Sequence, residues 1–348
     1  MQLICIGDIA NTQKQSTQQK WAPPGGLPLN DEVRVLFNME LPLGGVVNPK
    51  PRTSGPRLFT DPELLQKIKG WSPGFAALAT NHMLDSGEDG LKQTIDLLQQ
   101  AGFESFGAGS TLEQITKPLI WQTKEGCLAV INWVFPETHP DWMLIPGPNC
   151  WPGAEAAERT IQDLKSQTDW VMVFAHWSDE CFPYPRPEDR IMARSLVRMG
   201  ADVVVAHHPH VVRGMELIGT CPVFYSIGNY FFSDHPDANG GWIVRQAPRN
   251  RESLGILLSL QRGMKPEYQI LSFWSSRGQT ILDPIRRAAR RFESVSRPLK
   301  QLDENQYREW YKMQRRRFDR WGYRWHFGIW SLGIRGVKRR VMRLFKPF

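Results

Sequence analysis

The sequence of 348 residues has little that would place it in or across a membrane. Its longer apolar runs, such as residues 128–135, fall far short of the roughly 20 residues that a membrane-spanning helix needs. The first ten residues, MQLICIGDIA, have no basic segment, no long apolar stretch and no small-residue cleavage site. They therefore predict a strand and a turn and no signal peptide, and we expect a cytoplasmic protein.

Cysteine is scarce, odd in number and scattered. The five residues are Cys5, Cys127, Cys150, Cys181 and Cys221. They lack the paired spacings of a zinc ribbon or of a disulfide framework, and this pattern fits a reducing compartment. The sequence therefore indicates a fold that is stabilised by an ordinary apolar core.

Acidic residues are scarce only at the C-terminal end. Residues 284–348 hold 19 Lys and Arg against 5 Asp and Glu, whereas the rest of the chain holds 24 against 30. The formal net charge of +8 therefore conceals an acidic part and a strongly basic part. We expect a domain over residues 1–283 and a basic tail over residues 284–348.

Apolar runs alternate with helical patterns in the first part, which predicts an α/β layered domain. The runs that predict buried strands are residues 3–6, 33–37, 75–79, 128–134, 170–175, 203–206, 223–227, 254–260 and 268–274. Helical periodicity appears over residues 90–101, 154–165 and 188–199.

Polar residues follow five of the predicted strands. They are Asp8, Asn38 and Glu40, Asn81 and His82 with Asp85 close behind, His176 with Glu180, and the group His207, His208 and His210. The carboxyl ends of strands in α/β sheets build ligand sites. A set of carboxylate, amide and imidazole groups without thiolate suits Mn, Fe, Zn or Mg.

Three of only eight histidines lie in the stretch VVVAHHPHVVRG. Pro209 fixes its own φ and disfavours the helical region for His208, so we expect His208 to be extended. Two imidazoles on one rigid turn can then reach the same metal ion. The alternative is that these histidines are solvated or hydrogen-bonded to the backbone at a strand end.

The order Asp, Asn-x-Glu, Asn-His, His and His-x-His resembles the metallophosphoesterase-like superfamily, and within it the CapA family named for poly-γ-glutamate capsule synthesis. The resemblance covers residues 3–234 and is carried by GDIA, FNMELPL, LATNHMLDSGEDGL, GAGS, FAHWSDE, GADVVVAHHPHVV and YSIGNYFF. It implies a four-layer sandwich of two sheets flanked by helices.

The resemblance also implies roles for individual residues. The positions that match metal ligands, for one or two divalent ions, are Asp8, Glu40, Asn81, His176, His208 and His210. His82 matches a histidine that protonates a leaving oxygen or steadies an oxyanion, and Asp85 is placed to hold its ring, so both are predicted to be catalytic. Asn38, Glu180 and His207 are predicted to contact substrate. For Glu180 the alternatives are that it binds a second ion or, equally well, that it is a loop carboxylate.

The sequence departs from the family pattern at four positions. Ala10 stands where metallophosphoesterases have a histidine two residues after the first aspartate, and Glu40 stands where they have a bridging aspartate. Ala206 and Ser178 each stand where the CapA pattern has glycine. The missing histidine removes a ligand from one of the two metal positions.

Arginine and aromatic residues alternate in the basic tail. One aromatic stripe at near-helical spacing is Tyr307, Trp310, Tyr311, Phe318, Trp321 and Trp325, and a second apolar stripe is Trp330, Ile334, Val337, Val341 and Leu344. An amphipathic, basic helix of this kind fits an anionic membrane surface, which we expect at the inner face of the membrane. The alternatives are that the stripes pack on the main domain, or that the tail binds nucleic acid, which nothing else in the sequence supports.

Two functions fit these features. One is a metal-dependent hydrolase that acts on a phosphoester or a related polar bond of a small molecule or polymer. The other is a CapA-like component of envelope or capsule polymer synthesis or export, with little hydrolysis of its own. The ligand set favours the first, and the family association favours the second.

Overall fold

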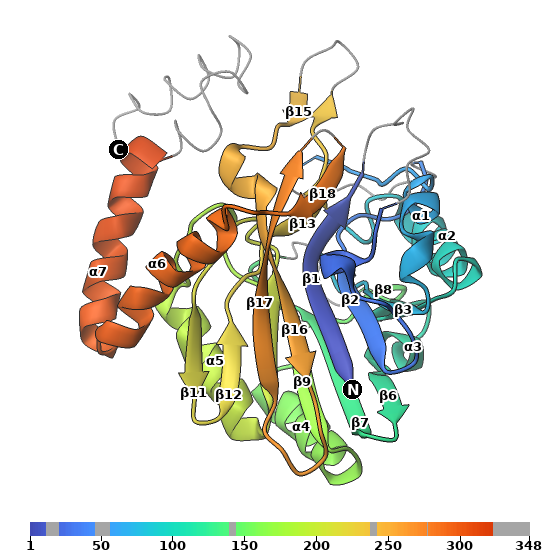
Figure 1. Ribbon diagram of the computed structural model, residues 1–348, viewed down its shortest axis with the longest axis horizontal. Coiled ribbons are helices and arrows are strands. Elements are labelled where there is room, and N and C mark those ends of the chain that lie inside the picture. The colour runs from blue at the N-terminus through green and yellow to red at the C-terminus, as the bar shows by residue number, and fades with distance from the viewer. Residues whose placement is uncertain (12–20, 46–55, 139–143, 237–241, 277, 323–348) are drawn as a thin grey trace.

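Two β-sheets pack face to face between layers of helices (Figure 1). The structure, a computed structural model, describes residues 1–11, 21–45, 56–138, 144–236, 242–276 and 278–322. Each run that the sequence predicts as a strand overlaps a strand, and each predicted helix overlaps α2, α4 or α5. The predicted four-layer α/β sandwich with a helical C-terminal extension is confirmed.

The larger sheet contains β1 near its centre, with parallel neighbours on one side and antiparallel neighbours on the other. Its order is β18 (Gln279–Leu282), β17 (Glu267–Ser276), β16 (Glu252–Ser259), β1 (Gln2–Ala10), β2 (Val33–Met39), β3 (Gly74–Ala77) and β4 (Phe103–Phe106). In addition, β13 (Asn229–Phe232) pairs with the end of β1. The parallel strands β1, β2 and β3 therefore end at one edge.

The smaller sheet is parallel in its centre. Its order is β11 (Met215–Ile218), β12 (Cys221–Phe224), β10 (Val203–His207), β9 (Trp170–His176), β7 (Gly126–Val134) and β6 (Leu119–Thr123). The strands β7, β9, β10 and β12 run in the same direction, so their carboxyl ends also meet.

Helices and short elements complete the described chain. They are α1 (Leu64–Lys67), α2 (Gly87–Gln100), α3 (Leu112–Thr116), α4 (Ala154–Gln167), α5 (Pro187–Met199), α6 (Arg287–Gln301), α7 (Glu304–Arg317), the single turns at Pro24–Gly26, Lys69–Trp71, Pro248–Arg251 and Phe318–Gly322, and the strand pairs β5 (Ala108–Gly109) with β8 (Gly147–Pro148) and β14 (His235–Pro236) with β15 (Trp242–Val244). None of the helices within these residues is both long and apolar enough to cross a bilayer.

Side chains alternate across the strands and fill three layers of core. Leu3 of β1 and Phe174 of β9 lie between the sheets. Leu91 of α2 packs with the outer face of the larger sheet. Ile161 of α4 and Leu196 of α5 pack with the outer face of the smaller sheet. The helices thus cover both sheets and leave the carboxyl ends of the parallel strands for the site.

The first part of the basic tail packs on the sandwich. Phe292 of α6 joins the core between the sheets, and Tyr307 of α7 joins the cluster outside the smaller sheet. The Tyr307 hydroxyl donates a hydrogen bond to the carbonyl oxygen of Pro185 at 2.7 Å, and the Arg190 guanidinium lies 4.3 Å from its ring centroid. The division at residue 284 stays a prediction about domain organisation.

Other aromatic residues of α7 also face the domain. The Trp310 ring lies 4.6 Å from that of Tyr184, and the Tyr311 ring lies 5.3 Å from that of Phe182. The alternative in which the stripe packs on the main domain therefore holds for these two residues. The side chains of Trp321 and Trp325 and the second stripe, residues 330–344, lie outside the described part of the chain.

Candidate metal centre

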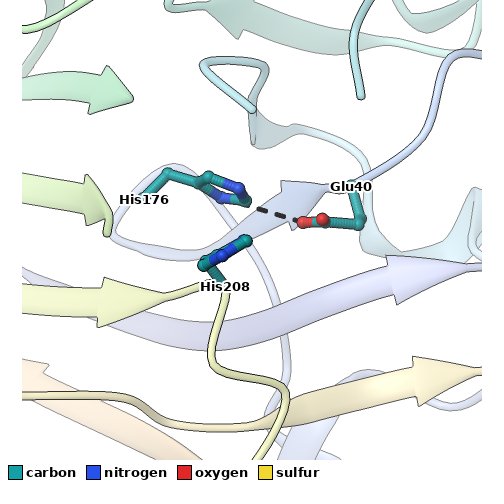
Figure 2. A group of neighbouring side chains, drawn as sticks. All are labelled: Glu40, His176 and His208. Atoms are coloured by element: carbon teal, nitrogen blue, oxygen red, sulfur yellow. Dashed lines mark ion pairs between the residues drawn. The ribbon is translucent and has the colours of Figure 1, made fainter. Parts of the chain in front are cut away.

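The predicted ligands come together at one edge of the sandwich, where strands of both sheets end. Asp8 of β1 and Glu40, which follows β2, come from the larger sheet. His176 ends β9, and His208 follows β10 in the smaller sheet. All four are buried. Figure 2 shows Glu40, His176 and His208 pointing toward one another from separate strands.

A bulge in β1 turns Asp8 toward the site. The pairing of β1 with β2 shifts register between Ile6 and Asp8, and such a bulge redirects the next side chain. Gly7 allows a close crossing of two segments at this point, since a Cβ on Gly7 would lie 1.7 Å from the carbonyl oxygen of Gly228. This contact explains the glycine of GDIA, whereas Gly228 of SIGNYFF is required by its own φ of +75° and by the carbonyl oxygen of Glu252, which a Cβ would approach to 2.7 Å.

The two buried carboxylates share one amide donor. The Asn38 side-chain nitrogen donates to Asp8 Oδ1 and to Glu40 Oε2, both at 2.8 Å. Asn38 is itself completely buried behind them. This position fits orientation of the carboxylates better than the predicted contact with substrate.

His176 has neighbours from both sheets. Its Nδ1 lies 3.8 Å from Glu40 Oε2 and 3.0 Å from His207 Nδ1, and its Nε2 lies 3.0 Å from Asn81 Oδ1. The rings of His176 and His208 have centroids 4.5 Å apart. Asn81 is thus in reach of the centre, as predicted, whereas His207 is fully buried below it.

His210 approaches the second carboxylate oxygen of Asp8. Its Nδ1 is 3.0 Å from Asp8 Oδ2 and 2.9 Å from Asn229 Oδ1. Asn229 was not among the residues predicted for the site. The pairing of β13 with the end of β1 brings Asn229 here, and only the YSIGNYFF block hints at this pairing in the sequence.

The turn that carries the histidines differs from the prediction. His208 has φ +90° and His210 has φ +57°, so the expected extended conformation of His208 is wrong. The proline effect disfavours only the right-handed helical region for the preceding residue, and tertiary contacts set the rest. Positive φ is costly for histidine and is found where the surroundings over-determine the conformation, often at functional sites.

Burial and neighbouring charges shift the pKa values of the ionisable groups in the centre. Burial and the charge of Asp8 hold the pKa of Glu40 well above its usual range. Burial opposes protonation of His210, but the hydrogen bond and charge of Asp8 together with the charge of Glu40 raise its pKa to about 10. Burial and the neighbouring histidines hold the pKa of His176 and of His208 well below the usual range, so both have free lone pairs at neutral pH.

The residues fit a divalent ion. Glu40 Oε1 and His208 Nδ1 are buried and have no hydrogen-bond partner among the described residues. Ligand atoms of Glu40, His176 and His208 all lie within 4.8 Å of one another, and so do those of Asp8, Glu40 and His207. A cation would satisfy these atoms and neutralise the carboxylates. Oxygen and imidazole nitrogen are compatible with Mn, Fe, Zn or Mg alike.

The predicted catalytic pair has the predicted geometry at the rim of the centre. His82 Nδ1 and Asp85 Oδ2 are 2.6 Å apart, and the same carboxylate oxygen accepts from the backbone N–H of Leu58 at 2.9 Å. The ring of His82 is therefore held by Asp85. The catalytic roles themselves stay predictions.

Glu180 lies on an exposed turn after β9, and its negative charge contributes to the raised pKa of Glu40 and of His210. Arg213, completely buried, holds this turn by donating to the carbonyl oxygens of Asp179 at 2.6 Å and Phe182 at 2.9 Å. No pattern around Arg213 in the sequence predicts this role.

A match to the family described as "Bacterial capsule synthesis protein PGA_cap" covers residues 6–234, and the chain belongs to this family. The family is part of the metallophosphoesterase-like superfamily.

Curated relatives carry related names. The chain is 26% identical to the PGA biosynthesis protein CapA of Bacillus subtilis over 68% of this chain and 60% of that one. It is 29% identical to the capsule biosynthesis protein CapA of Bacillus anthracis over 44% of this chain and 39% of that one. The chain thus spans about two fifths to three fifths of the length of these relatives.

Among solved structures, a phosphatase from Mycoplasma pneumoniae is 10% identical over 82% of this chain and 95% of that chain, with a TM-score of 0.47. A likeness at this level adds nothing to the family assignment.

Replacing His208 with alanine should lower metal content and leave the fold intact. Loss of an outer-shell partner costs about 10–100-fold in metal affinity, and loss of a ligand should cost at least as much. Elemental analysis of the purified variant measures this. His235→Ala, a buried histidine outside the centre, is the matched control. Unchanged metal in His208→Ala would contradict the assignment.

Replacing His82 with alanine should leave the metal in place. If the protein turns over a substrate, we expect a loss of about 10²–10⁴-fold, the usual contribution of a general acid or base. Metal analysis and rate measurement on the same preparation separate the two effects. A metal loss equal to that of His208→Ala would mean that His82 is a ligand.

Proposed function

We propose that this protein is a metal-dependent hydrolase that acts on a phosphoester or a related polar bond. The observation that carries the proposal is the convergence of Glu40, His176 and His208 from three strand ends, with buried donor atoms that lack partners among the described residues. Such a group is costly to bury without a cation. The His82–Asp85 pair beside it supplies the proton transfer that hydrolysis needs.

The bound ion would supply the positive charge and Lewis acidity that activate water and polarise the substrate. The chain's own residues divide the remaining tasks. Asp8 and Glu40 hold negative charge at the centre, and Asn38 fixes the orientation of both. Asp85 holds His82 at Nδ1, so a proton on Nε2 can pass to a leaving oxygen or stabilise an oxyanion.

The test uses the purified full chain, stripped by chelator and then supplied with Mn²⁺. Model phosphomonoesters and phosphodiesters are the substrates. We expect turnover that requires the metal and that falls in His82→Ala. Metal bound without turnover on any of them would shift the weight to the second candidate.

The second candidate is a component of envelope or capsule polymer synthesis or export that hydrolyses little by itself. The observation that favours it is the family and the names of the two Bacillus relatives, one of which is described as a PGA biosynthesis protein. The polymer would then be the substrate or cargo. Activity that appears only when polymer or other cellular components are added would support it.

The tail would bring the protein to the inner face of the membrane. Tyr307, Trp310 and Tyr311 of the first stripe pack on the domain. The proposed membrane-binding surface is therefore the second stripe, residues 330–344, and it rests on the sequence pattern alone. Basic residues lie largely off that stripe and would meet anionic lipid, each contributing about 1 kcal/mol. Nucleic acid remains the less favoured partner.

Replacing five basic residues with glutamine in the full chain should abolish flotation with anionic liposomes. The residues are Arg335, Lys338, Arg339, Arg340 and Arg343. Neutral liposomes are the control for purely apolar attachment. Equal flotation of both proteins, or no binding of the unaltered chain, would contradict a membrane role.

A further inference from the structure

The turn that follows β9 is bonded directly to the segment that carries the site histidines. The backbone N–H of Cys181 donates to the carbonyl oxygen of Pro209 at 2.8 Å. The side chain of Asn250, which is buried, donates to the carbonyl oxygen of His210 at 2.9 Å and lies 3.9 Å from the sulfur of Cys181. The conformation of this turn and that of the histidine segment are therefore linked.

The turn has a backbone that needs support from its surroundings. Ser178 has φ +76° and Cys181 has φ +62°, and neither residue is a glycine. Such conformations are costly, and they persist where contacts impose them. The buried Arg213 supplies part of this support through its bonds to the carbonyl oxygens of Asp179 and Phe182. Further contacts with the turn come from α7.

The α7 helix encloses one side chain of the turn and pairs with another. Phe182 is almost completely buried, and the rings of Tyr311 and Phe318 have centroids 5.3 Å and 5.1 Å from its own. The guanidinium carbon of Arg315 lies 5.2 Å from the same centroid, within the range of a cation–π contact. Arg315 Nη1 also lies 2.8 Å from Asp179 Oδ2. One arginine thus contacts the turn at two points.

The α7 helix lies on the outside of the molecule and follows α6 (Figure 1). It lies beyond residue 234, where the family match ends, so its contacts with the turn are a feature that the family assignment does not describe. Tyr307 of α7 is buried, and the other side chains of the helix are half-buried or exposed. The contacts with the turn can therefore be altered by substitutions that leave the core unchanged.

We propose that α7 is part of the site, and that Arg315 is a positioning residue that holds the turn through Asp179 and Phe182. The turn in its place holds the segment of His208 and His210 through the backbone bond to the proline between them. Arg315 acts through the turn and not by contact with substrate. The effect on turnover rests on the function proposed above, whereas the effect on the backbone does not.

The first measurement is hydrogen–deuterium exchange in the full chain, for the peptides that cover residues 178–184 and 207–213. Both should exchange about three- to tenfold faster in Arg315→Gln, because a partly exposed ion pair and a cation–π contact are lost. Arg315→Lys keeps the charge and should retain most of the protection. Arg308→Gln is the matched control, since Arg308 lies on the same helix and pairs with Glu188 of α5, outside the turn, at 3.6 Å.

The second measurement is the affinity for Mn²⁺ of the chain stripped by chelator, together with turnover of a model phosphodiester. Both should fall in Arg315→Gln by a factor similar to that of the exchange, and Arg308→Gln should match the unaltered protein. The melting temperatures of the two variants should be equal, which separates a local effect on the turn from a general loss of stability.

Equal exchange in Arg315→Gln and the unaltered protein, or an equal change in Arg308→Gln, overturns the proposal. Faster exchange of residues 178–184 with full protection of residues 207–213 overturns it as well, because the turn would then not hold the histidine segment. Absence of Mn²⁺ binding or of turnover in the unaltered protein would count against the proposed hydrolase activity alone.

Discussion

The burial of two carboxylates side by side is the constraint on which the site depends. Asp8 and Glu40 have no exposed surface, and each would repel the other in water-free surroundings. The structure offsets this with the shared Asn38 donor and with His210, whose Nδ1 lies 3.0 Å from Asp8 Oδ2. A cation is the remaining element that would balance the charge.

Much of the fold could be predicted from the hydrophobic periodicity of the sequence and from the polar residues at strand ends. Buried parallel strands appear in a sequence as apolar runs, and here polar residues follow them. Asp8, Glu40 and His176 could be placed in this way. The left-handed conformations of His208 and His210 could not, since Pro209 disfavours only the right-handed helical region for His208 and leaves the remaining choice to tertiary contacts. The packing of Tyr307 on Arg190 could be given only as one alternative, because an aromatic stripe has the same pattern whether it faces protein or lipid.

The turn after β9 links the site to α7. Ser178 stands where the family pattern has glycine and has φ +76°, and its hydroxyl accepts from buried Arg213 at 2.6 Å and bonds to Asp189. These bonds offset the strain that glycine would avoid. From α7, Arg315 pairs with Asp179 of the same turn at 2.8 Å. The basic tail therefore helps to hold the segment that carries Glu180, whatever its remaining residues bind.

The packing around position 10 leaves no room for the histidine that metallophosphoesterases have there. Ala10 lies in a buried apolar cluster with Leu41, Leu58 and Phe232, so an imidazole there would need that cluster to open. The imidazoles that approach Asp8 come instead from the segment at the end of β10. His210 Nδ1 lies 3.0 Å from Asp8 Oδ2, and His207 Nδ1 lies 3.6 Å from Asp8 Oδ1. Asp8 thus keeps imidazole neighbours although its own strand supplies none.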